Sequence, residues 1–121
     1  MSNKTKHILI VEDEKPLSHA LELKLHNEGH TTRVVTNGQD ALSAIKEDDF
    51  DVMLLDMMMP VMDGFQVLEK LQDVEKKPVI FVLSNLSLHD DKDRVLGMGA
   101  RDFFVKSEIS LADVVHEINQ T

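Results

Sequence analysis

Asp51-Val-Met-Leu-Leu-Asp56 decides the fold of this chain, because four apolar residues stand together between two aspartates without polar residues interleaved. A strand with one face in water alternates polar and apolar residues, whereas a strand buried on both faces is apolar throughout. Three further apolar runs are His7-Ile-Leu-Ile-Val11, Val79-Ile-Phe-Val-Leu83 and Phe103-Phe-Val105. A fifth candidate strand, Thr31 to Thr36, is more polar and is expected at an edge of the sheet.

Helical spacing of apolar residues marks the segments that follow these runs. Asp63 and Ser110 precede two such segments and are the expected N-caps. The weakest helical pattern lies in the segment after Ser84, because His89 to Arg94 are charged and the apolar residues come only after them. Strands that alternate with helices in this way predict a doubly wound α/β domain with a five-stranded parallel sheet. The apolar helix faces are Leu17, Ala20, Leu21 and Leu25; Ala41, Leu42 and Ile45; Phe65, Leu68 and Leu71; Val95, Leu96 and Met98; and Leu111, Val114, Val115 and Ile118.

The composition excludes several classes of protein. At 121 residues the chain fits one domain, expected over residues 1–121 with a core of 6–119. The absence of Cys excludes disulfides, thiolate metal sites and cysteine nucleophiles. Thirteen Lys and Arg against 22 Asp and Glu give a net charge of −9, which argues against direct binding of nucleic acid. The polar start and the lack of a long apolar stretch predict a cytoplasmic protein without membrane contact.

Polar residues follow the apolar runs, and they are Glu12, Asp13, Asp56, Ser84 and Lys106. Because the carboxyl ends of parallel strands lie at one edge of a sheet, we expect these side chains to meet there. Three carboxylates in one place repel one another, and a divalent cation relieves that repulsion. All-oxygen ligands favour Mg²⁺, with Asp13 and Asp56 as direct ligands and Glu12 acting through water.

This set of groups suits phosphoryl transfer, in which catalysis consists mainly of alignment and of neutralising charge. Asp56 is the predicted nucleophile, because a carboxylate attacks phosphorus without a general base. Mg²⁺ and Lys106 would neutralise the charge, and Ser84 would donate a hydrogen bond to the new phosphate. Any one of the carboxylates alone could be a solvated loop residue, but their convergence with Lys106 and Ser84 favours a site.

Five short motifs occur in order along the chain. They are Ile-Leu-Ile-Val-Glu-Asp-Glu at 8–14, Asp-Met-Met-Met-Pro-Val-Met-Asp-Gly at 56–64, Leu-Ser at 83–84, Gly-Ala-Arg-Asp-Phe at 99–103 and Val-Lys at 105–106. Together they resemble the motifs of response-regulator receiver domains from two-component phosphorelay systems. The resemblance implies a flavodoxin-like (βα)5 fold with strand order 2-1-3-4-5. It also implies a signalling switch that catalyses only its own phosphorylation and dephosphorylation.

The resemblance assigns roles to individual residues. Asp56 is the implied phosphoacceptor, Glu12 and Asp13 are the implied acidic pair, and Lys106 corresponds to the lysine of the family. The backbone carbonyl of Met58 is the implied third protein ligand of Mg²⁺. The phosphodonor would be a histidine kinase or a histidine phosphotransfer protein. We also expect a downstream protein partner of unknown identity and a monomeric chain that could dimerise on phosphorylation.

The resemblance further implies a two-state switch made of Ser84 and Phe103. Phosphate would draw Ser84 inward and Phe103 would follow, which remodels the surface around the last two strands. Ser107 stands where a proline in a cis bond is usual, and Phe103 replaces a commoner Tyr, so no hydroxyl is available there. Met58 and Leu86 occupy positions that tune hydrolysis in the family. Since neither side chain can orient water, we expect slow hydrolysis of the phosphorylated state.

Other interpretations of these residues remain open. A small metal-dependent phosphatase could use Asp56, but Met58 stands where such enzymes usually have a second acid. A phosphorylation-independent scaffold would keep the fold without the chemistry, although every catalytic group is present. Phe103 could be a core aromatic, and Met57 to Met59 could be core residues or a partner-binding patch. The segment from His89 to Arg94 could be a solvated helix face or a dimer surface.

Overall fold

The computed structural model describes residues 5–59, 61–85 and 89–121. Strands alternate with helices along this part of the chain, as the pattern of apolar runs predicts. In chain order the elements are β1 (His7–Val11), α1 (Lys15–Asn27), β2 (Thr31–Val35), α2 (Gly38–Glu47), β3 (Val52–Leu55), α3 (Gly64–Leu71), β4 (Val79–Ser84), α4 (His89–Gly97), β5 (Asp102–Val105) and α5 (Leu111–Asn119).

The strands form one parallel sheet in the order β2-β1-β3-β4-β5, so the predicted α/β class and strand order are confirmed. The more polar strand β2 lies at an edge, as expected. Val11 of β1 pairs with Leu55 of β3, and Leu55 pairs with Val82 of β4. This register aligns the carboxyl ends of the strands. The residues that follow them therefore meet at one edge.

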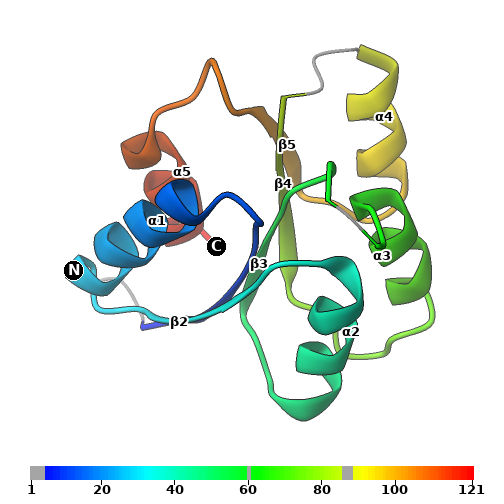
Figure 1. Ribbon diagram of the computed structural model, residues 1–121, viewed down its shortest axis with the longest axis horizontal. Coiled ribbons are helices and arrows are strands. Elements are labelled where there is room, and N and C mark those ends of the chain that lie inside the picture. Colours follow the sequence, from blue (N-terminus) through cyan, green and yellow to red (C-terminus); the bar gives the residue numbers. More distant parts are fainter. Residues whose placement is uncertain (1–4, 60, 86–88) are drawn as a thin grey trace.

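Helices cover both faces of the sheet, with α1 and α5 on one side and α2, α3 and α4 on the other (Figure 1). Successive residues of β1 contribute to the two sides alternately. Ile8 and Ile10 belong to an apolar cluster with residues of α1 and α5, while Leu9 and Val11 belong to a cluster with residues of α2 and α3. A strand covered on both faces needs apolar side chains throughout, which explains the uninterrupted runs in the sequence.

Both predicted N-caps are confirmed. Asp63 accepts a hydrogen bond from the N–H of Gln66 at 2.9 Å, and the Gln66 side chain accepts one from the N–H of Asp63 at 3.0 Å. This reciprocal pair is a capping box and fixes the start of α3. Ser110 accepts from the N–H of Asp113 at 3.1 Å and so caps α5.

Helix α4 has the charged outer face that its sequence suggests. Residues 92–94 are exposed, whereas Val95 is fully buried against the sheet. The guanidinium of Arg94 lies 3.9 Å from the centre of the Phe65 ring, a cation–π contact that connects α4 to α3. None of the helices in the described ranges combines the length and apolar character needed to cross a bilayer.

Candidate functional site

Three carboxylates follow the carboxyl ends of two adjacent strands. Glu12 and Asp13 come directly after β1, and Asp56 comes directly after β3. The N–H of Asp56 donates to the carbonyl oxygen of Val11 at 3.0 Å, so the pairing of the strands continues to the acid itself. Each of the three side chains offers an oxygen that lies within 4.8 Å of the others. The convergence expected from parallel strands is therefore observed.

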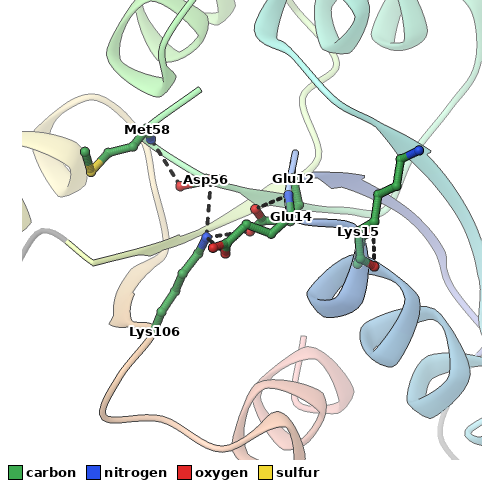
Figure 2. Close-up of polar contacts among 7 residues, drawn as sticks. Glu12, Glu14, Lys15, Asp56, Met58 and Lys106 are labelled. Carbon is green, nitrogen blue, oxygen red and sulfur yellow. Dashed lines mark hydrogen bonds and ion pairs between the residues drawn. The ribbon is translucent and has the colours of Figure 1, made fainter. Parts of the chain in front are cut away.

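Lys106 brings a positive charge to this group from the end of β5. The backbone N–H of Lys106 donates to the carbonyl oxygen of Ser84 at 2.8 Å, which fixes the residue beside β4. Figure 2 shows the ammonium pointing at the carboxylates. The Nζ atom lies 2.8 Å from Glu12 Oε1, 2.9 Å from Glu14 Oε2 and 3.3 Å from Asp56 Oδ2. The predicted contact with Asp56 exists, but it is the longest of the three.

Burial shapes the electrostatics of the site, since Glu12 and Asp56 are each only 3% exposed. Burial raises the pKa of Glu12 from 4.5 to about 7, against the lowering effect of hydrogen bonds from Lys106 and from the N–H of Glu14. Burial lowers the pKa of Lys106, but hydrogen bonds to Glu12 and Glu14 outweigh it and leave that pKa above its ordinary value. The two shifts have different causes, because exclusion of water dominates at Glu12 and the surrounding carboxylates dominate at Lys106.

A hollow of about 240 Å³ opens beside these charges. The loop after β3 closes one side of it, and the N–H of Met58 donates to Asp56 Oδ1 at 3.1 Å. Gly64 allows α3 to start against this loop, because a Cβ at that position would lie 2.8 Å from the Cα of Met57. The hollow leaves Asp56 reachable from outside. Its lining residues are Asp13, Glu14, Asp56, Met58, Asn85 and Lys106.

The predicted switch residues lie deeper than the hollow. Ser84 is fully buried at the end of β4, and Phe103 on β5 is 7% exposed. Phe103 packs in the apolar cluster on the side of α2 and α3, so the structure has it as a core aromatic, and its role as a switch stays a prediction. Met57 and Met59 are buried while Met58 is 59% exposed, so the three methionines divide between core and surface.

Glu14 is absent from the predicted site residues, although its carboxylate contacts Lys106 directly. The available signal was its place in the acidic run Glu12-Asp13-Glu14, which continues past the strand end. The peptide bond between Lys106 and Ser107 is trans, and the described part of the chain contains no cis bond. Leu86, predicted to slow hydrolysis, lies outside the described residues.

Known proteins share both the sequence pattern and the fold. The family model described as "Response regulator receiver domain" matches residues 8–119. The "Uncharacterized transcriptional regulatory protein YkoG" of Bacillus subtilis is 35% identical over 100 residues, which cover 83% of this chain and 44% of that protein. The chain thus spans less than half the length of this relative.

Solved receiver structures superpose on nearly the whole chain. The receiver domain of the Francisella response regulator 1452 has a TM-score of 0.90 and 27% identity, and the match covers 96% of this chain and 95% of that one. Response regulator TrrA from Thermotoga maritima, solved in complex with Mg²⁺-BeF, has a TM-score of 0.83 and 24% identity, with 96% and 98% of the two chains covered. At that lower identity the second likeness concerns the fold alone. The chain therefore belongs to the response regulator receiver domain family of two-component signalling, and it is a signalling switch rather than a conventional enzyme.

Proposed function

We propose that Asp56 accepts a phosphoryl group from a histidine kinase or a histidine phosphotransfer protein in a Mg²⁺-dependent reaction. The observation that carries this proposal is the position of Asp56 Oδ2, 3.3 Å from the Lys106 ammonium and within a set of three converging carboxylates. In the reaction a carboxylate oxygen of Asp56 bonds to phosphorus, while the bond between phosphorus and the imidazole nitrogen of the donor breaks. Membership of the receiver family supports the same reaction.

The donor set fits Mg²⁺, because carboxylate oxygens are the hard ligands that this ion prefers. Each of the three carboxylates offers an oxygen within 4.8 Å of the others, so they could hold one ion between them, directly or through a water molecule. We assign Asp13, Asp56 and the Met58 carbonyl as direct ligands and Glu12 as a ligand through water. The Mg²⁺-BeF complex of the Thermotoga relative supports this choice of ion.

A bound Mg²⁺ would supply positive charge that offsets the negative charge of the transferring phosphoryl oxygens. Lys106 would act from the other side by donating N–H groups to the same oxygens. Asp56 itself needs no general base, and the N–H of Met58 holds its other oxygen at 3.1 Å. Ser84, at the adjacent strand end, would donate to the phosphoryl group once it is attached.

The output of the switch would be a changed surface near β4 and β5, with Ser84 and Phe103 moving together. A protein rather than nucleic acid is the proposed partner, because the chain carries a net charge of −9. The Bacillus relative is named a transcriptional regulatory protein, and the match covers 44% of it. We place the chain in the cytoplasm, where its phosphodonor would act.

Intact-mass measurement after incubation with acetyl phosphate tests the proposal. We expect one phosphoryl adduct on the wild type that requires Mg²⁺ and disappears in Asp56→Asn. Asp51→Asn is the matched control, because Asp51 lies before the opposite end of β3 and its carboxylate accepts from the N–H of His7 at 2.8 Å. This control should be phosphorylated like the wild type. The decay of the adduct measures the slow hydrolysis expected from Met58.

A folded wild type that gains no adduct from acetyl phosphate or from a phosphorylated phosphotransfer protein would contradict the proposal. The phosphorylation-independent scaffold would then be the better description. An adduct that survives in Asp56→Asn would instead place the phosphoryl group on a different residue.

A further inference from the structure

The ammonium of Lys106 has three N–H groups to donate. Three carboxylates lie within reach of it, at 2.8 Å for Glu12, 2.9 Å for Glu14 and 3.3 Å for Asp56. One donor can therefore be assigned to each carboxylate. A phosphoryl oxygen on Asp56 can gain a hydrogen bond from Lys106 only if one of these three contacts is given up.

The three carboxylates differ in how easily they can release the ammonium. The side chain of Glu12 is only 3% exposed, and its other oxygen accepts from the N–H of Glu14 at 3.0 Å. Asp56 is the residue that would carry the phosphoryl group, so Lys106 must stay close to it. The side chain of Glu14, by contrast, is 57% exposed, and water can solvate its carboxylate at once when the contact breaks.

Glu14 also occupies a helix-cap position at which its side chain does not cap the helix. It is the N-cap residue of α1, yet its side chain makes no capping hydrogen bond. Ser, Thr, Asp and Asn are the residues that usually accept a hydrogen bond from the helix at this position, and Glu is not one of them. Here the carboxylate reaches Lys106 across the hollow instead, as Figure 2 shows. The side chain can therefore be altered without removing a helix cap.

We propose that Glu14 is a positioning residue that sequesters the Lys106 ammonium in the unphosphorylated protein and is displaced when the phosphoryl group arrives on Asp56. The proposal rests on the proposed function of Asp56. While Glu14 holds one N–H group of Lys106, the ammonium has fewer donors for the phosphoryl oxygen, so Glu14 slows phosphorylation. After displacement it no longer contacts Lys106, so it has no effect on the decay of the phosphorylated state.

The test measures the rate constants of phosphorylation by acetyl phosphate and of subsequent decay, at saturating Mg²⁺, for the wild type and two variants. Exposed ion pairs contribute little, so Glu14→Gln should accelerate phosphorylation by about two- to fivefold and leave decay unchanged. Glu14→Asp keeps the charge but falls about 1.5 Å short of the ammonium, so it should also accelerate the reaction. Glu47→Gln is the control, because the Glu47 side chain is 59% exposed and pairs with Arg33 at 2.8 Å away from the site.

The outcomes separate capture of Lys106 from other effects. Equal rates in the wild type and Glu14→Gln, or a slower variant, would overturn the proposal while an adduct on Asp56 still upholds the proposed function. Acceleration in Glu14→Gln alone, with Glu14→Asp at the wild-type rate, would overturn capture in favour of simple repulsion between Glu14 and the anionic donor. Parallel changes in phosphorylation and decay would also overturn it, because they indicate general loosening of the site.

Discussion

The two edges of the sheet both carry acidic side chains, but these side chains differ in how they are paired with hydrogen-bond donors. At the carboxyl edge, Lys106 faces Glu12, Glu14 and Asp56, and two of these acids are buried. At the amino edge, each polar group of His7 has a partner of its own. Its N–H donates to Asp51 at 2.8 Å, and its ring nitrogens lie 2.7 Å from Thr31 Oγ1 and 2.7 Å from Asp48 Oδ2.

The pKa values of the acids at the two edges are shifted in opposite directions. At the amino edge the hydrogen bond with His7 lowers the pKa of Asp48 below 3.8, so its charge is favoured. At the carboxyl edge burial raises the pKa of Glu12 to about 7, so its charge is disfavoured. The comparison teaches that acidic residues beside a nitrogen donor do not by themselves mark a site. Buried anions in excess of the available cation do, because a further cation can then bind with a gain in free energy.

Removal of Lys106 should have the largest effect on stability. Lys106→Met leaves Glu12 and Asp56 buried without a cation, and we expect a loss of about 3 kcal/mol in the free energy of unfolding at pH 8. Urea denaturation measures this loss, and added Mg²⁺ should recover part of it. Lys76→Met is the control from the amino edge, since Lys76 pairs with Asp49 at 3.4 Å and both side chains are 82% exposed. It should change stability by less than about 0.5 kcal/mol.

Equal losses in the two lysine variants would erase the distinction between the edges. A large loss in Lys106→Met that Mg²⁺ fails to reduce would separate the role of the lysine from that of the metal site.

The affinity for Mg²⁺ should depend on pH through Glu12. Its pKa of about 7 means that a proton must leave before the carboxylate can assist the ion. Between pH 8 and pH 6 the apparent affinity should therefore fall about tenfold. In the metal-free protein, the raised pKa of Glu12 should make stability decline as the pH rises from about 4.5 to about 7. In that range the unfolded chain releases the proton of Glu12 while the folded protein still holds it, and above about 7 this contribution to stability is lost. Calorimetric titration with Mg²⁺ at several pH values measures the first effect, and Glu12→Gln should flatten the dependence. An unchanged affinity from pH 6 to pH 8 would contradict it.

The smallest effect is expected for Asp48→Asn. The lowered pKa of Asp48 stabilises the fold above pH 3.8, and this contribution disappears as the pH falls through the lower value in the folded state. The variant should therefore be slightly less stable than the wild type at pH 7, and the difference should vanish in acid. Urea denaturation across this range measures it. Mg²⁺ affinity and phosphorylation should stay unchanged, and a defect in either would connect the two edges.

The fold could be predicted from the sequence because its signals are local. The uninterrupted apolar runs of β1 and β3 reflect burial on both faces, and the polar run of β2 reflects its place at an edge. Asp63 and Ser110 cap their helices through neighbours three residues away, a spacing that the sequence displays directly. The meeting of Glu12, Asp13 and Asp56 followed from parallel strand direction alone.

The approach of Lys106 to Asp56 was predicted, but the partner of Glu14 could not be predicted in the same way. Glu14 reaches Lys106 although the two are 92 residues apart, and no local pattern encodes that contact. The division of Met57, Met58 and Met59 between core and surface also depends on how α3 covers the loop.

The sequence by itself determined the strands and the acids that follow them, because apolar patterning acts over a few residues. The order of the strands was implied by the resemblance to receiver domains and not by that patterning. Tertiary structure alone decided which carboxylates share the Lys106 ammonium and how far burial raises the pKa of Glu12. Those quantities depend on distances of a few ångströms between separate strands and on exclusion of water, which are set only when the sheet and its helices have packed.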